Sequence, residues 1–101
     1  MASQQEFSTL IQQQQPVLVD FFATWCGPCK MMTPILTDVK AKLGEQVRII
    51  KIDVDKHPAL AAELQVQGVP TLMLFKSGKL LWRQSGVVPA AQLQQIIQKN
   101  S

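Results

Sequence analysis

The fold of this 101-residue chain is decided by one stretch, Trp25-Cys26-Gly27-Pro28-Cys29-Lys30. An apolar run at residues 16–22 precedes it and predicts a strand. Behind it, apolar side chains recur at spacings of three and four, which predicts a helix over residues 26–43 that stops at Gly44. The apolar positions of that helix are Met32, Ile35, Leu36, Val39 and Leu43. The two cysteines therefore lie where a strand gives way to a helix.

Cys26 and Cys29 are spaced for reversible disulfide chemistry. Residues three apart in a first helical turn have Cβ atoms about 5–6 Å apart, and a disulfide needs about 3.8 Å. Cys26 lies at the helix start, where free N–H groups and the helix dipole favour an anion. Lowering the pKa of a thiol from about 8.5 to about 7 takes roughly 2 kcal/mol, which is the upper range of what a helix terminus supplies. Cys29 lies one turn further in, facing the core, where burial disfavours its thiolate. We therefore expect Cys26 to attack and Cys29 to resolve, with Pro28 tolerated because the first turn does not need its N–H.

Other roles for a cysteine pair fit this sequence less well. A structural disulfide is one alternative, and half of a zinc site is another. Tetrahedral zinc takes four ligands, and only His57 remains as a further histidine or cysteine. A c-type haem attachment requires a histidine after the second cysteine, where this chain has Lys30. We therefore interpret the pair as redox-active and expect no metal site.

Periodicity and turn signals predict elements in the order αβαβαββα. The helices are expected at residues 4–14 (after a capping-box pattern at 3–6), 26–43, 58–65 and 90–99, and the strands at 17–23, 47–53, 71–76 and 79–85. Helices between the early strands imply parallel crossovers, and Ser77-Gly78 predicts an antiparallel hairpin. We expect an α/β fold, with one mixed central sheet covered by helices on both faces, in a single domain spanning residues 1–101.

Four segments, in this order, resemble the thioredoxin family. They are residues 17–30, 51–55, 68–72 and 75–78, and the likeness extends from about residue 7 to residue 99. The resemblance implies the thioredoxin fold. That family usually begins with a further strand, for which residues 1–3 are too short, so we expect four strands, with 47–53 at a sheet edge or covered by the N-terminal segment. Phe22 also departs from the family, which commonly has a tryptophan there.

Asp20 and Lys51 are the charged residues most closely tied to the expected site. Asp20 lies in a strand that is apolar on both faces, so we expect it to be buried, which is rare for Asp without a partner or a purpose. The alternative is a structural carboxylate satisfied by nearby donors. The resemblance implies that Asp20 receives the Cys29 proton, through water, and that Lys51 pairs with it and moderates its pKa. Without the resemblance, the Lys51 ammonium would simply extend to solvent.

The resemblance also implies a substrate-binding surface around the cysteines. Val69-Pro70 resembles a family loop in which the proline is cis and faces the disulfide, although cis is the minority form at about 5–6% of X–Pro bonds. Such a loop offers the Val69 backbone to an extended client peptide, in the manner of a short added strand. The residues expected on this low apolar surface are Trp25, Gly27, Pro28, Gly68, Val69, Pro70, Gly86 and Val87.

Composition narrows the partners and the compartment. Ten basic and seven acidic residues give a net charge of +3, with no Lys/Arg run, so we expect no nucleic-acid binding. No apolar stretch approaches a membrane span, and the N-terminus lacks the pattern of a secretory leader. Two cysteines in such a chain favour a redox role over a disulfide framework. We expect a cytoplasmic monomer without membrane contact.

These observations predict a thiol–disulfide oxidoreductase that reduces disulfides in client proteins. The resemblance implies regeneration by a thioredoxin reductase supplied with NADPH, so no cofactor is expected to stay bound. Two alternatives remain open. The same pair could catalyse oxidation or isomerisation, although Gly-Pro between the cysteines resembles the reducing members. The chain could instead be a binding subunit that docks through its apolar surface.

Overall fold

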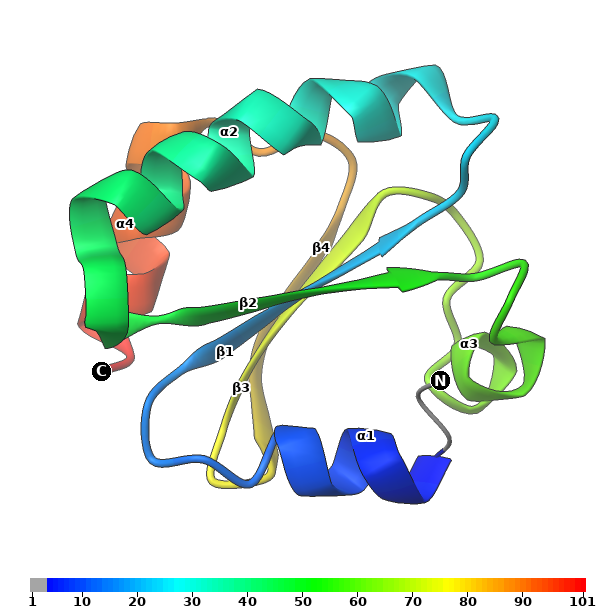
Figure 1. The fold of residues 1–101 in the computed structure, drawn as a ribbon, viewed down its shortest axis with the longest axis horizontal. Coiled ribbons are helices and arrows are strands. Elements are labelled where there is room, and N and C mark those ends of the chain that lie inside the picture. The colour runs from blue at the N-terminus through cyan, green and yellow to red at the C-terminus, as the bar shows by residue number, and fades with distance from the viewer. Residues whose placement is uncertain (1–3) are drawn as a thin grey trace.

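The computed structural model describes residues 4–101 and contains four strands in that part of the chain (Figure 1). The helices are α1 (Gln4–Leu10), α2 (Gly27–Leu43), α3 (Pro58–Glu63) and α4 (Ala90–Lys99), with a 3-10 turn η1 (Gly44–Gln46) after α2. The strands are β1 (Val17–Phe22), β2 (Arg48–Asp53), β3 (Thr71–Lys76) and β4 (Lys79–Ser85). The expected element order is therefore confirmed, with one short 3-10 turn added.

The sheet is mixed, and β1 is one of its two inner strands. The strand order is β2-β1-β3-β4, with β1 parallel to β2 and antiparallel to β3, and β3 antiparallel to β4. A parallel pair needs a long crossover, which α2 supplies between β1 and β2. Residues Val17 to Phe21 of β1 are almost completely buried, as expected for a strand covered on both faces.

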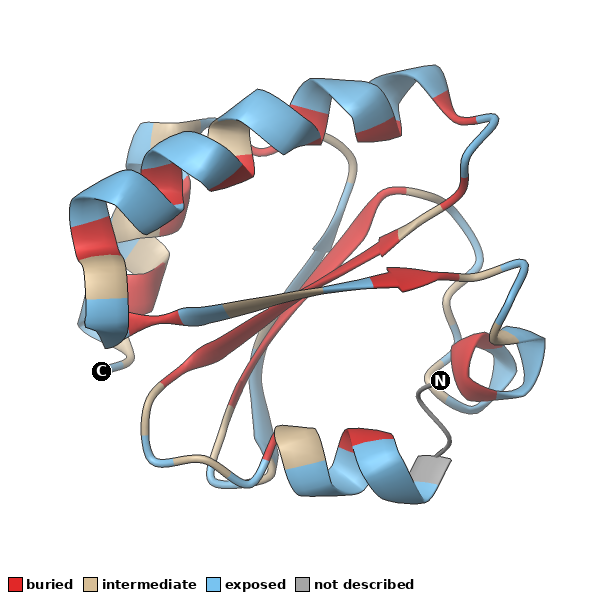
Figure 2. Cartoon of the chain, viewed as in Figure 1, coloured by how far each residue is buried: buried red, intermediate tan, exposed pale blue. Residues whose placement is uncertain are grey.

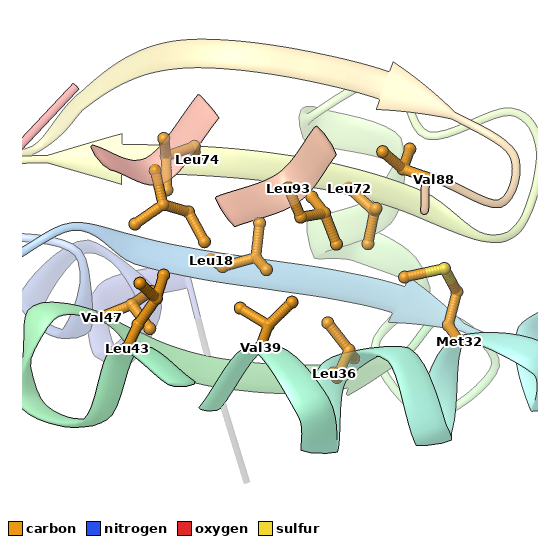
Figure 3. Packing of buried hydrophobic residues seen from close by; sticks show 11 residues of the cluster. Leu18, Met32, Leu36, Val39, Leu43, Val47, Leu72, Leu74, Val88 and Leu93 are labelled. Atoms are coloured by element: carbon orange, nitrogen blue, oxygen red, sulfur yellow. The ribbon is translucent and has the colours of Figure 1, made fainter. Parts of the chain in front are cut away.

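Helices α2 and α4 cover one face of the sheet, and α1 and α3 cover the other (Figure 1). Leu18 of β1 packs under α2 and α4, as Figure 3 shows, among a cluster of apolar side chains. The other members of that cluster are Met32, Leu36, Val39, Leu43, Val47, Leu72, Leu74, Val88, Leu93 and Ile97. On the opposite face, the Phe7 ring lies with its centroid 6.3 Å from that of Phe21 and 5.4 Å from that of Phe75. These two faces make up the core.

The N-terminal helix is shorter than the sequence predicts. The sequence predicts this helix over residues 4–14, and α1 ends at Leu10. The Gln13 side-chain amide donates to the Leu10 carbonyl at 2.8 Å, so this carbonyl accepts a side-chain donor where a longer helix would supply a backbone N–H. The backbone N–H groups of Ser77 and Gly78 then donate to the Gln13 and Ile11 carbonyls, both at 2.9 Å. The turn of the β3–β4 hairpin therefore holds the end of the α1 segment.

Most other boundaries agree with the predicted ones. The ranges of β3, β4 and α4 match, α3 ends two residues early, and β2 begins at Arg48 instead of Val47. The predicted capping box includes Ser3, which lies outside the described residues. Strand β2 lies at a sheet edge, as expected for a chain in which the first family strand is missing from the described residues.

Candidate active site

Cys26 is the N-cap of α2, and its sulfur does what a capping oxygen usually does. Its backbone is extended (φ −89°, ψ 115°), and its Sγ accepts the Cys29 backbone N–H at 3.1 Å. Pro28 follows in the first turn, where its missing N–H has no helical partner to lose. A backbone N–H group aimed at a sulfur atom favours negative charge on that atom.

Cys26 and Cys29 are joined as a disulfide in this structure. Their Cα atoms are 5.3 Å apart, within the usual range for a disulfide, so the backbone of the helix start accommodates the bond. Both residues are 4% exposed, and they pack with Ala23, Phe22 and Val69. The expected placement of the pair, at the junction of strand and helix, is therefore confirmed.

The loop before β3 faces the cysteines, and its Val69–Pro70 peptide bond is cis as expected. The Val69 carbonyl oxygen lies 3.6 Å from Cys26 Sγ. The Gly86 N–H donates to the Pro70 carbonyl at 2.8 Å, which brings the end of β4 beside the loop. Gly86 has a φ of +94°, a conformation that side-chain-bearing residues rarely adopt. Residues from three distant parts of the sequence thus meet around the disulfide.

The surface next to the disulfide is open and largely apolar. The Trp25 side chain is 71% exposed, and its Nε1–H donates to Asp55 Oδ2 at 2.9 Å. A small groove of about 140 Å³ lies beside it, lined by Trp25, Val54, Val66, Gln67, Gly68 and Val69. Gly27 and Pro28 are also exposed, whereas Pro70 is buried and Val87 packs partly buried against the α2–α4 cluster. Most of the expected surface residues are therefore brought together.

Sequence analysis assigned no role on this surface to two of its residues. Asp55 accepts the Trp25 Nε1–H and so orients the ring, and Val54 packs against the cysteines and lines the groove. Asp55 and Val54 belong to a segment already singled out by its family likeness. Their position past the carboxyl end of β2, beside the end of β1, is the signal that would have found them.

Asp20 is completely buried, as predicted, on the face of the sheet that α2 covers. Side chains alternate along a strand, so Asp20 shares this face with Leu18, which packs against α2. Neither carboxylate oxygen has a hydrogen-bond partner among the described residues. Burial raises the pKa of Asp20 from 3.8 to about 6, and the charge of Lys51 opposes this rise. Asp20 can therefore bind and release a proton near neutral pH.

Lys51 lies beside Asp20 in the sheet without bonding to it. The two residues are register partners in the β1–β2 ladder, so their side chains project from the same face. The Lys51 Nζ lies 5.1 Å from the centroid of the Phe22 ring and donates to Thr33 Oγ1 at 3.5 Å. Within the described part of the chain, Asp20 forms no ion pair, so Lys51 acts on it only through space.

Among the described residues, no group of three or more His, Cys, Asp or Glu side chains is placed to hold a metal ion. None of the described helices combines the length and the apolar character required to span a bilayer.

The chemistry available to this site is dithiol–disulfide exchange, which places the protein in the class of thiol–disulfide oxidoreductases. The family model named Thioredoxin matches residues 1–99, and the chain belongs to the thioredoxin family.

The relatives agree with this assignment in sequence and in fold. The chain is 49% identical over 102 residues to a thioredoxin-like protein of Synechocystis sp., covering 97% of each protein. It is 46% identical over 101 residues to the chloroplastic thioredoxin Y of Oryza sativa, covering 96% of this chain and 60% of that one. The structure of oxidised mitochondrial thioredoxin 3 from Saccharomyces cerevisiae superposes with a TM-score of 0.87 at 41% identity, covering 98% of this chain and 92% of that chain. The predicted family and fold class are confirmed.

Proposed function

We propose that this thioredoxin reduces disulfide bonds in client proteins, with Cys26 as the attacking thiolate. The observation that carries the proposal is the Cys29 N–H aimed at Cys26 Sγ from the first turn of α2. In the reduced protein, the Cys26 thiolate attacks one sulfur of a client disulfide. A Cys26–client bond forms, the client S–S bond breaks, and one client sulfur leaves as a thiolate that takes a proton from water.

Cys29 completes the exchange with Asp20 as its proton acceptor. The Cys29 thiol passes its proton to the Asp20 carboxylate, directly or through water, and the new thiolate attacks Cys26 Sγ. The second client sulfur leaves as a thiolate, and the Cys26–Cys29 disulfide forms. The client gains two electrons and the cysteine pair loses them. A carboxylate with a pKa of about 6 is suited to this transfer near neutral pH. The charge of Lys51 keeps the pKa of Asp20 from rising further.

Client binding is assigned to the surface around the disulfide. The Val69 backbone, next to Pro70, is available to pair with an extended client segment on either side of its cysteine. Trp25, Gly27, Pro28 and Gly86 supply a flat surface that admits many sequences. The Val69 carbonyl lies 3.6 Å from Cys26 Sγ, so a client segment paired with the Val69 backbone is brought close to the nucleophile.

Regeneration of the dithiol requires a second protein. We assign it to a thioredoxin reductase that draws electrons from NADPH, with no cofactor resident in this chain. A relative from Mycobacterium leprae, 42% identical over 87 residues that make up 86% of this chain and 19% of that protein, is named bifunctional thioredoxin reductase/thioredoxin. A reducing compartment, the cytoplasm, suits a protein that must return to the dithiol, and we propose that it acts as a monomer.

The experiment is reduction of insulin disulfides with NADPH and a thioredoxin reductase. The parent should turn over insulin, and Cys26→Ser should fall to the background rate. A parent without turnover would contradict the reductase assignment and favour a docking subunit. If the protein restored activity faster to a substrate protein with scrambled disulfides than to the same protein in its reduced form, isomerisation would be favoured. Cys29→Ser should accumulate mixed disulfides at Cys26, and their mass identifies the clients.

The order of attack is tested separately by alkylation of the reduced protein near neutral pH. Iodoacetamide should label Cys26 far faster than Cys29, because only Cys26 has the helix-start N–H groups to stabilise its thiolate. Mass spectrometry of the two peptides over time gives both rates. Equal rates would contradict the assignment of Cys26 as the nucleophile.

A further inference from the structure

Strand β2 has a free edge among the described residues. It pairs with β1 on one side only, and in Figure 2 much of it is drawn exposed or intermediate while β1 is buried. The N–H groups of Arg48 and Val54 donate to carbonyls before and at the end of β1, at 2.9 Å each. Because the direction of backbone groups alternates along a strand, the N–H and C=O groups of Ile49 and Lys51 point away from β1. The Asp53 carbonyl, by contrast, accepts the N–H groups of the following turn.

A groove of about 610 Å³ lies between this edge and α2. It is lined by Thr33, Leu36, Thr37, Lys40, Ala41, Arg48, Ile49 and Lys51. Ala41 is exposed and Ile49 partly exposed, so both provide apolar surface in the groove, whereas Leu36 is buried beneath it. A strand laid against β2 could therefore form backbone hydrogen bonds and bury side chains at the same time.

The charged residues that line the groove are all of one sign. Lys40, Arg48 and Lys51 line it, and no acidic residue of the described chain does. The Lys40 Nζ donates to the Gly44 and Val47 carbonyls at 2.8 and 2.7 Å, which fixes one positive charge near the start of β2. Asp38, the nearest acid along α2 to Lys40, pairs with Lys42 at 3.6 Å and does not line the groove. The groove thus presents a positive surface to whatever covers it, because Glu45 before β2 and Asp53 at its end do not line it.

We propose that this edge and groove bind an extended acidic segment of a partner protein, which adds to β2 as a fifth strand. Its backbone pairs with Ile49 and Lys51, and its carboxylates meet the cations that line the groove. Positive charges on an edge strand also hinder pairing with a second copy of this chain, because such pairing would bring like charges together. An acidic partner relieves that repulsion, and for this reason we favour it over a dimer.

This surface lies apart from the cysteines, although it shares Lys51, whose charge acts on Asp20. The groove begins at Thr33, one helical turn past Cys29, and runs along α2 to Arg48, whereas the client surface lies around Trp25 and Val69. A partner bound along β2 leaves the client surface around Trp25 and Val69 uncovered. The surface can therefore hold a partner while the cysteines react with it or with another protein.

The test uses a blocked eight-residue peptide of alternating Glu and Val, titrated into the 15N-labelled full chain at low salt. The amide resonances of Ile49 and Lys51 should shift most, since those N–H groups gain carbonyl acceptors. Arg48→Glu should weaken binding by about tenfold, because it reverses a charge that lines the groove. The matched control is Lys79→Glu, the same change on the opposite edge strand β4, and it should leave affinity within about twofold.

Two control peptides separate strand addition from simple attraction. A peptide with Lys in place of Glu should not bind. A peptide with Pro in place of one central Glu and of the neighbouring Val should bind weakly, because it loses a backbone donor whichever set of N–H groups faces β2. Equal binding of the Pro peptide would overturn the proposal in favour of charge attraction alone. Four other outcomes would also overturn the proposal. Two concern the peptide titration: equal weakening of binding by Arg48→Glu and Lys79→Glu, and resonance shifts centred on β4. The other two are an absence of binding and, without peptide, shifts of Ile49 and Lys51 that depend on protein concentration. If Arg48→Glu shifts resonances far from β2, Arg48→Gln replaces it in the test. This variant removes the charge without reversing it, so it should weaken binding about half as much on a free-energy scale.

Discussion

The two faces of strand β1 serve different ends, although their residues alternate along six positions of one chain segment. Toward α1 and α3, β1 presents only apolar side chains, and Phe21 joins Phe7 in an aromatic contact. Toward α2, it presents Leu18 and then a buried carboxylate, Asp20, without a hydrogen-bond partner among the described residues. The first face stabilises the fold. On the second face, the buried carboxylate destabilises it, next to the helix that carries the cysteines.

The size of that loss follows from the pKa of Asp20. A rise from 3.8 to about 6 corresponds to roughly 3 kcal/mol of destabilisation when the group is charged, at about 1.36 kcal/mol per pKa unit. Burying one large apolar side chain contributes about 1.5–3 kcal/mol. The opposite face therefore offsets the buried charge with one or two of its side chains. A core position can therefore hold an ionisable side chain when its neighbours supply the stability, as the proposed role of Asp20 requires.

The largest expected change in stability comes from the apolar face. Phe21→Ala should lower the free energy of unfolding by about 3–5 kcal/mol, because it removes a fully buried ring and leaves a cavity. Denaturant unfolding measures the loss. The rate of insulin reduction per folded molecule should stay close to the parent, since this face does not contact the cysteines. If Phe21→Ala slowed insulin reduction as much as a substitution at the active site does, the two faces of β1 would not differ in function.

Asp20→Asn should act in the opposite direction and depend on pH. The folded state binds the Asp20 proton more tightly than the unfolded chain does, so the parent loses stability as pH rises from 3.8 to about 6 and stays lower above it. The free energy of unfolding of the oxidised variant should therefore exceed that of the parent by up to about 3 kcal/mol at pH 8 and by little at pH 4. The cost of burying an Asn amide without hydrogen-bond partners reduces this gain. Denaturant midpoints at the two pH values measure this. It should also release clients from the mixed disulfide more slowly, and a gain independent of pH would contradict the raised pKa.

Lys51→Met should have the smallest effect and sharpen the account of Asp20. Removing the ammonium takes away the charge that opposes the rise, so the pKa of Asp20 should move upward from about 6. The variant should lose less than about 1 kcal/mol at pH 8, where Asp20 is charged, and nothing from this source at pH 4, because the exposed ammonium acts through space. The control is Lys56→Met, an exposed lysine beyond β2. Equal pH dependence in both variants would show that Lys51 does not act on Asp20.

Much of the fold could be predicted because local signals and tertiary packing agree. The Ser77-Gly78 turn defines the β3–β4 hairpin, and the spacing of Leu93 and Ile97 places α4, so their bounds match. The burial of Asp20 followed from the apolar residues on either side of it. The end of α1 could not be predicted, because it depends on where the Gln13 side chain bonds.

The finer contacts of the site were beyond the sequence for the same reason. The pairing of Trp25 with Asp55 joins residues 30 apart, and the Lys51 ammonium rests on Phe22 only because β1 and β2 are in register. Neither partner carries a local signal of the other. The cis bond before Pro70 was expected through family resemblance alone, since composition favours trans.

The link between the hairpin turn and the N-terminal segment has a consequence for hydrogen exchange. The amides of Ser77 and Gly78 are held by the carbonyls of Gln13 and Ile11, not by strand partners. Deuterium can reach them when the α1 segment lifts away, even while β3 and β4 stay paired. The protection of these two amides therefore reports the free energy of undocking the first helix, and comparison with the β1 amides separates that opening from global unfolding.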